Sequence, residues 1–191
     1  MCMLMAQKKY AKAFTLVELM VVVAIIGITS TIVVVSLVNA RLERQVLGAS
    51  QKIAAVIRAA QNDALTGRST GSTEKNCWYG VKFTAPSTYQ IVSYDRGSVA
   101  NAPCGGASVN IKGTFSLESG VEFDDPARDV IAFYLPRGEV WYGNDASSMQ
   151  AVPAGTTSAY TLTLRKSDKS AYVCIYPGGR IEESGVGQSC P

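Results

Sequence analysis

The sequence predicts an α+β protein in which one long amino-terminal helix precedes a domain of antiparallel strands, and three patterns predict it. Residues 14–38 are almost wholly apolar, lack proline and contain Glu18 as their one ionisable side chain. Residues 39–66 continue with apolar side chains three and four positions apart, which is the period of an amphipathic helix. From residue 77 onward, apolar side chains alternate with a period of two, as they do in strands.

Residues 1–13 form a short basic segment that carries the net charge of the chain. It contains Lys8, Lys9 and Lys12, whereas the basic side chains that follow (18 less these three) number 15 and equal the 15 acidic ones. Positive charge beside an apolar segment stays in the cytoplasm, so we expect residues 14–38 to cross the inner membrane with the carboxyl-terminal part outside. The neutral remainder argues against a broadly basic nucleic-acid-binding protein.

Residues 14–38 are long enough to cross a bilayer. Their 25 residues, at a rise of ~1.5 Å each in a helix, exceed the ~30 Å of a hydrocarbon core. A carboxylate at the centre of such a segment costs ~2.5–3.5 kcal/mol; Glu18 lies near one end, where the cost is lower, but its presence still needs a reason. Two other interpretations stay open. One is a signal anchor, and the other is a secretory signal peptide cut after Ala40, although the apolar core of a signal peptide is only ~7–15 residues long and this segment is longer.

The heptapeptide Lys12-Ala-Phe-Thr-Leu-Val-Glu18 joins the basic segment to the apolar one. It resembles the processing site of type IV pilins and type II secretion pseudopilins, and the resemblance extends from Lys12 to about Ile28. It implies that prepilin peptidase removes residues 1–13 between Ala13 and Phe14, and that the new amino terminus is methylated. Ala13 departs from the family, which usually has glycine there. Glu18 corresponds to the glutamate that is the fifth residue of the mature chain.

Glu18 then has a physical role in assembly. A carboxylate without a partner is costly in lipid, whereas in a bundle of like helices it can pair with the amino terminus of a neighbouring subunit. Such a pair would also fix the axial register between subunits. The resemblance therefore implies a structural subunit that waits in the inner membrane, with its head in the periplasm, and is moved by an assembly platform into a filament of pilin or pseudopilin subunits.

Residues 39–66 predict that the helix continues beyond the membrane, with Gly67 as its stop. The apolar stripe consists of Leu42, Val46, Ala49, Ile53, Val56, Ala60 and Ala64. A stripe of this kind has to be buried against another element, and the small side chains on it favour close packing against a sheet rather than a free coiled coil.

Residues 67–191 predict a β-rich head of eight or nine strands. Residues 67–75, 96–108 and 143–158 have the composition of loops, and Pro177-Gly178 fits the central positions of a type II turn. The strands are expected at 77–83, 89–94, 109–117, 121–124, 130–135, 139–142, 160–164, 171–176 and 180–183.

A second resemblance covers residues 130–183. The spacing of Phe133-Tyr-Leu-Pro-Arg-Gly138 and the later Gly179-Arg180-Ile181 resemble the GspH/FimT branch of pilin-like proteins. This resemblance implies a β-sandwich-like head packed on the helix, and a minor pilin of a type IV pilus. Major pilins usually carry a proline in the apolar helix, and its absence between Phe14 and Val38 favours a minor pilin or, as the alternative, pseudopilin H of a type II secretion system.

The cysteines predict disulfides rather than a metal site. Cys2 would leave with the leader, and the other four lie in the part expected outside the inner membrane, where disulfides form. Three connectivities are open, and sequence proximity favours Cys77–Cys104 and Cys174–Cys190. The chain has no histidine, the commonest general base and metal ligand. We therefore expect no enzyme activity, no cofactor and no zinc.

Two further binding sites have partial support in the sequence. Some FimT-like pilins bind DNA through a Gly-Arg-x-Arg motif, of which Gly179-Arg180 is the first half; Glu182 occupies the second arginine position, and a carboxylate repels phosphate. DNA binding through Arg180 is thus the alternative function of another class. Asp124, Asp125 and Asp129 could bind calcium, but their spacing differs from that of an EF-hand and Asp-Asp-Pro is a common turn.

Overall fold

The computed structural model describes residues 14–67, 76–95, 109–118, 120–124, 130–135, 138–144, 149–151 and 160–190. The chain divides into two compact units, residues 1–40 and residues 41–191. The predicted α+β fold is confirmed: one long helix precedes strands that pair in antiparallel fashion. Ala13, Cys104, Asp125 and Asp129 lie outside the described residues, as do most residues of the three predicted loops.

Helix α1 (Leu16–Thr66) contributes residues to both units. It begins two residues after the predicted start at Phe14, because Thr15 caps it. It ends where predicted: Gly67 adopts a φ of 61°, and its N–H donates to the Ala64 carbonyl at 3.4 Å. A left-handed residue of this kind ends many helices, and glycine adopts it without steric cost.

The buried side of α1 follows the predicted stripe. Val46, Ala49, Ile53, Ala60 and Ala64 are buried, whereas the outer members of the stripe, Leu42 and Val56, are half-buried. The remaining buried helix residues are Ser50, Ala54 and Ile57.

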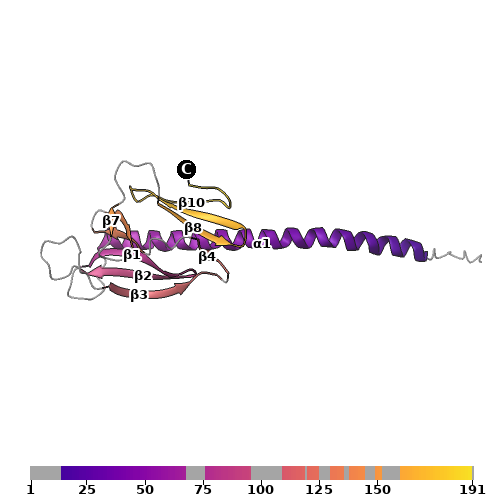
Figure 1. The fold of residues 1–191 in the computed structure, drawn as a ribbon, viewed down its shortest axis with the longest axis horizontal. Coiled ribbons are helices and arrows are strands. Elements are labelled where there is room, and N and C mark those ends of the chain that lie inside the picture. Colours follow the sequence, from indigo (N-terminus) through magenta and orange to yellow (C-terminus); the bar gives the residue numbers. More distant parts are fainter. Residues whose placement is uncertain are drawn as a thin grey trace, which may run out of the picture. The chain divides into compact units, whose positions relative to one another are not determined.

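Two antiparallel sheets accompany the helix in the second unit (Figure 1). The six-stranded sheet has the order β3-β2-β1-β5-β6-β7, and the four-stranded sheet has the order β10-β9-β8-β4. The first comprises β1 (Asn76–Ala85), β2 (Thr88–Asp95), β3 (Val109–Ser116), β5 (Val130–Tyr134), β6 (Glu139–Gly143) and β7 (Gln150–Ala151). The second comprises β4 (Glu122–Phe123), β8 (Tyr160–Lys166), β9 (Lys169–Ile175) and β10 (Ile181–Ser184).

Nine of these strands coincide with predicted ones, and β7 does not. β7 lies inside the predicted loop 143–158 and consists of two residues paired with Trp141 and Tyr142 of β6. So short a strand has no alternation of its own. It forms because the exposed edge of β6 offers it hydrogen bonds, which local sequence does not encode.

A single core joins the helix to both sheets. Side chains of α1, including Ile53 and Ile57, share one buried cluster with Tyr79 of β1 and with Leu164 and Val173 of the four-stranded sheet. Across the two sheets, the rings of Phe83 and Phe123 meet edge to face with centroids 4.7 Å apart. Each large apolar side chain buried here contributes ~1.5–3 kcal/mol, so this cluster holds the helix and the sheets together.

A second cluster covers the opposite face of the six-stranded sheet. It contains Trp78, Val92, Tyr94 and Val130, with Trp141 packed against it. The indole rings of Trp78 and Trp141 stack with centroids 5.7 Å apart. β1 is therefore apolar on both faces, which explains its central place in the sheet.

The predicted type II turn at Pro177-Gly178 is wrong. Such a turn requires a positive φ at Gly178, but the residue with positive φ is Gly179, at 78°. The Gly179 N–H donates to the Tyr176 carbonyl at 2.8 Å, and the Tyr176 N–H donates to the Arg180 carbonyl at 2.9 Å. The loop between β9 and β10 is thus of the three-residue kind, in which the last loop residue is left-handed.

Candidate assembly segment

The start of α1 places Glu18 in the first helical turn. The Thr15 hydroxyl oxygen accepts a hydrogen bond from the Glu18 N–H at 3.3 Å, and the Thr15 carbonyl accepts from the Leu19 N–H at 3.2 Å. Thr15 is therefore the amino-terminal cap of the helix. Thr-x-x-Glu at this position is the pattern of a capping box, and a carboxylate in the first turn interacts favourably with the helix dipole. Glu18 thus has a stabilising role in the single subunit.

Sequence reasoning missed this cap although the signal was present. The change from basic to apolar residues predicts a helix start at Phe14. Thr15 and Glu18, however, have the spacing of a capping box, which indicates that the helix begins after Thr15.

The apolar segment presents side chains on every side of the helix. All residues from Phe14 to Ala40 are exposed within their unit, with Phe14 at 77% and Ile32 at 67%. In the described part of the chain, α1 is the one helix long and apolar enough to cross a membrane. A surface of this kind has to lie in lipid or against other apolar helices.

Three consecutive hydroxyls in the apolar segment are bonded to the helix itself. Thr29 donates to the Ile25 carbonyl at 2.9 Å, Ser30 to the Ile26 carbonyl at 2.7 Å and Thr31 to the Ile28 carbonyl at 2.7 Å. Because their donors are satisfied within the helix, these side chains can enter lipid at little cost.

One of the two predicted cysteine pairs lies within the described residues, and it is disulfide-bonded. A disulfide links Cys174 of β9 to Cys190, with Cα atoms 5.8 Å apart, and holds the carboxyl-terminal tail against the sheet. Cys77 is also disulfide-bonded; its predicted partner, Cys104, lies outside the described residues.

Arg180, the candidate for DNA contact, is occupied by neighbouring side chains. Its guanidinium lies 3.3 Å from a carboxylate oxygen of Glu182 and 4.0 Å from the centroid of the Tyr176 ring. Desolvation, and next the Glu182 carboxylate, raise the pKa of Tyr176. Glu182, which occupies the second arginine position of the motif, therefore neutralises the charge of Arg180.

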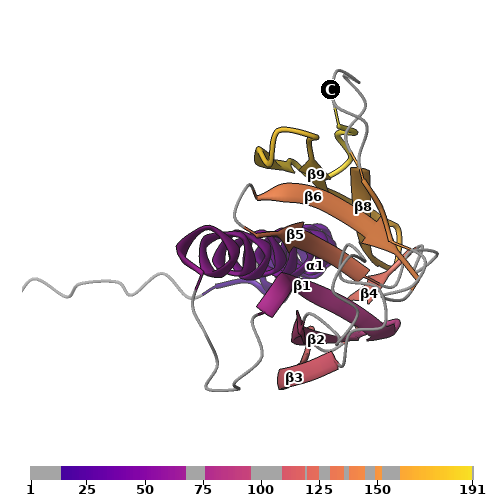
Figure 2. The same cartoon turned by 90° about the vertical axis from the view of Figure 1, so that its left-hand side faces the viewer.

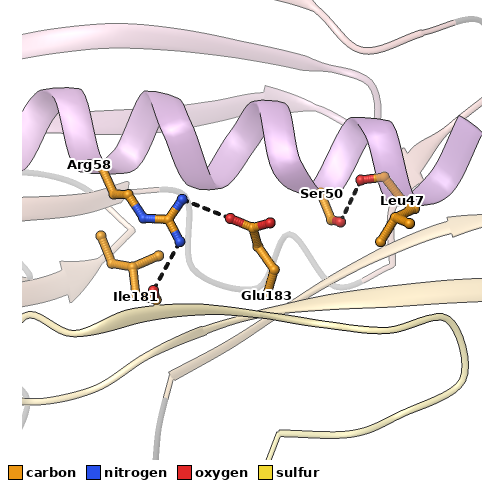
Figure 3. Close-up of polar contacts among 5 residues, drawn as sticks. All are labelled: Leu47, Ser50, Arg58, Ile181 and Glu183. Carbon is orange, nitrogen blue, oxygen red and sulfur yellow. Dashed lines mark hydrogen bonds and ion pairs between the residues drawn. The ribbon is translucent and has the colours of Figure 1, made fainter.

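The next residue along, Glu183, is bonded to α1. The Arg58 guanidinium donates to Glu183 at 2.7 Å and to the Ile181 carbonyl at 3.0 Å (Figure 3). Nearer the start of the same helix, Ser50 donates to the Leu47 carbonyl at 2.8 Å, and this bond satisfies a hydroxyl group on the buried side. Both arginines near β10 thus have carboxylate partners, so neither of these two described cations is free to bind a phosphate backbone.

Asp124, the described one of the three aspartates whose spacing differs from that of an EF-hand, forms an ion pair with Arg165 at 3.1 Å. Within the described residues, no group of three or more histidine, cysteine or acidic side chains is placed to hold a metal ion.

A model of a known protein family matches the amino-terminal segment of the chain. Residues 8–34 match a family model described as the prokaryotic N-terminal methylation motif. Two curated relatives, each described as "Fimbrial protein" of Pseudomonas aeruginosa, are 37% identical over 78 residues, which are 40% of this chain and 51% of each relative. The chain thus spans about half the length of the curated relatives it matches. No solved structure matches the chain significantly.

Proposed function

We propose that this chain belongs to the type IV pilin family and is a structural subunit of a filament that assembles through residues 14–38; its methylation motif and its similarity to fimbrial proteins support this proposal. Prepilin peptidase would cut between Ala13 and Phe14, and the new amino terminus would be methylated. The subunit would wait in the inner membrane with its head in the periplasm until an assembly platform moves it into the filament.

The observation that carries this proposal is the apolar surface of residues 14–38. Seventeen large apolar side chains, from Phe14 to Val38, are exposed within their unit. Leaving such a surface in water would cost on the order of tens of kcal/mol at ~1.5–3 kcal/mol per side chain. Lipid can cover it before assembly, and the same segments of neighbouring subunits can cover it afterwards.

Glu18 would give the assembly its register. In lipid its carboxylate has only the helix start to stabilise it, whereas beside a neighbour it can pair with the free amino group of Phe14 in that subunit. Removing one partner of a buried pair costs ~3–5 kcal/mol, far more than the ~1 kcal/mol of a helix cap. The pair can therefore discriminate correct from shifted stacking.

Among pilin-like subunits, we propose a minor pilin of the GspH/FimT kind in a type IV pilus. The head with two sheets packed on the helix and the lack of proline in residues 14–38 support this choice. The alternative is pseudopilin H of a type II secretion system, which would assemble by the same contacts. DNA binding is not proposed, because Arg180 and Arg58 are both paired with glutamates.

A pair of substitutions tests the role of Glu18. Glu18→Gln keeps the size of the side chain and removes its charge, so we expect normal insertion into the membrane but at least tenfold less subunit in sheared filaments. Thr15→Ala removes the cap and keeps the carboxylate, at a cost of about 1 kcal/mol to the helix start. We expect this control to assemble at more than half the normal level. Immunoblots of membrane and sheared-filament fractions would measure both.

Equal losses for the two variants would mean that Glu18 acts only through the helix start. Unimpaired recovery of Glu18→Gln would remove the proposed subunit pair altogether.

A further inference from the structure

Two arginines lie in the first turn of α1 within the second compact unit. Arg41 and Arg44 follow the apolar segment directly, are three positions apart and are both exposed, so they are neighbours on the helix surface. The other described arginines, Arg58, Arg165 and Arg180, each form an ion pair with a carboxylate. Among the residues that the structure describes, neither Arg41 nor Arg44 has such a partner. Their guanidinium groups are therefore available to an anion from outside the chain.

The carboxylate that lies between them in the sequence is bound by the tip of a hairpin. Lys169, at the start of β9, lies 3.4 Å from Glu43 and 3.6 Å from Asp168. Lys166, at the end of β8, pairs with Lys169 across the two-residue turn. Residues 41–44 and 166–169, which we call the basic patch, thus contain four cations and two carboxylates, a net charge of +2 (4 − 2).

The neighbouring strand β4 reduces this excess without removing it. Glu122 pairs in register with Arg165 of β8, and Asp124 forms an ion pair with the same arginine at 3.1 Å. These three residues add one net negative charge, so a net charge of +1 (5 − 4) remains. The basic patch therefore stays positive when its described neighbours are counted.

The continuity of α1 places the basic patch at the level of the lipid headgroups. This step rests on the proposed function, in which residues 14–38 cross the membrane. Glu43 is five residues beyond Val38 in the same helix, which is ~7.5 Å along its axis, and Arg41 is only ~4.5 Å beyond it. The headgroup region on each side of a bilayer is ~5–7 Å thick. Arginine side chains in this region extend their charged ends to the lipid phosphates.

The other hairpin of the four-stranded sheet contacts α1 much farther along. In both views of the fold this sheet lies on one side of α1, and β2 and β3 lie on the other (Figures 1 and 2). The β8–β9 turn contacts α1 at Glu43, whereas in the β9–β10 loop the Gly179 carbonyl accepts from Gln61 at 2.9 Å. These two helix positions are 18 residues (61 − 43) apart, or ~27 Å. The β9–β10 loop is therefore a matched control for the β8–β9 turn.

We propose that the basic patch binds the phosphate groups of anionic phospholipids in the outer leaflet of the membrane that residues 14–38 cross. Arg41 and Arg44 bind the lipid phosphates, because a guanidinium group offers phosphate two parallel hydrogen bonds. Lys166 and Lys169 add positive potential at the same level, which attracts anionic headgroups. Extraction of the subunit from the membrane would have to break these contacts.

Photocrosslinking of the full chain in vesicles tests the site. The vesicles contain three parts phosphatidylcholine and one part phosphatidylglycerol. A photoreactive residue is placed at Ser167 in the β8–β9 turn or, as the control, at Gly178 in the β9–β10 loop, where an added Cβ meets nothing within 4 Å. We expect at least five times as much lipid adduct at position 167 as at 178. Phosphatidylglycerol should form more than half of the adduct at 167, measured by mass spectrometry.

Substitutions separate the two arginines from a general effect of charge. With the photoreactive residue at position 167, Arg41→Gln combined with Arg44→Gln should return the share of phosphatidylglycerol in the adduct to its share in the vesicles. Lys52→Gln combined with Lys82→Gln removes the same charge from elsewhere in the second unit and should leave the preference unchanged.

Equal lipid adducts at positions 167 and 178, or an adduct with the composition of the vesicles, would overturn the lipid site, as would equal effects of the two double substitutions. Flotation of the chain with the vesicles is scored separately. A chain that does not float would contradict the proposed function and this inference with it, whereas a chain that floats without lipid preference would overturn this inference alone.

Discussion

Gly80 of β1 lies directly against the backbone of the neighbouring strand β5. It pairs with Ala132, and a Cβ at this position would lie 2.8 Å from the Ala132 Cα and would also collide with the Ile131 carbonyl oxygen. Both obstacles are backbone atoms of a central strand, which cannot move without breaking the ladder. Glycine is therefore required here by space rather than by backbone conformation.

Replacement of Gly80 by alanine should thus destabilise the head. We expect Gly80→Ala to lower the free energy of unfolding by ~2 kcal/mol or more, as overpacking in a rigid core does. The comparison is Gly48→Ala in α1, where nothing lies within 4 Å of an added Cβ and where alanine should raise stability by ~0.5–1 kcal/mol. Denaturant titration followed by the fluorescence of the Trp78–Trp141 pair measures both. Similar effects of the two substitutions would contradict this account of Gly80.

Individual residues were the hardest features to predict. The positions of Glu18 and Cys174–Cys190 follow from motif and spacing, because each depends on nearby sequence. The partners of Arg58 and Lys112 do not: Glu183 and Asp63 lie 125 and 49 residues away. Contacts over such separations depend on how the sheets fold back on the helix, which local pattern does not determine.

At the scale of elements, the hairpin between β9 and β10 depends on one glycine and not on its neighbour. Gly179 has a φ of 78°, and its carbonyl accepts a hydrogen bond from the Gln61 side chain at 2.9 Å. Gly178 has no neighbour within 4 Å of an added Cβ and lacks a positive φ. The hairpin thereby joins the four-stranded sheet to the carboxyl-terminal part of α1.

Alanine at these two positions should separate the two turn types. We expect Gly179→Ala to cost ~1–2 kcal/mol, because a left-handed φ is unfavourable with a Cβ and the new methyl would displace the Gln61 amide. Gly178→Ala should change stability by less than about 0.5 kcal/mol. Denaturant midpoints of the two variants provide the measurement, and the reverse order would restore the type II turn.

Most elements could be predicted because their periodicity is clear. The amphipathic stripe of α1 and the alternation in β8 reflect burial on one face, which the sequence records directly. β7 and the bulge at Lys112 could not be predicted, since each arises from pairing with a strand elsewhere in the chain. The division of the strands into two sheets likewise depends on contacts such as Phe83 with Phe123 rather than on any one segment.

For the whole molecule, the account concerns a chain whose side-chain charges balance after residue 13 and whose apolar segment must be covered by lipid or by other apolar helices. The three lysines of residues 1–13 carry the net charge, so their removal would leave a chain whose side-chain charges balance. A cut between Ala13 and Phe14 would also free the amino group that Glu18 of a neighbour is proposed to bind. In this proposal, processing and assembly are two consequences of one arrangement.

The amino terminus of the chain in sheared filaments tests the central claim most directly. Mass spectrometry and amino-terminal sequencing should show a polypeptide that begins with a methylated Phe14. A chain that still begins with Met1, one that begins at Arg41, or the absence of the chain from the filament fraction would contradict the account.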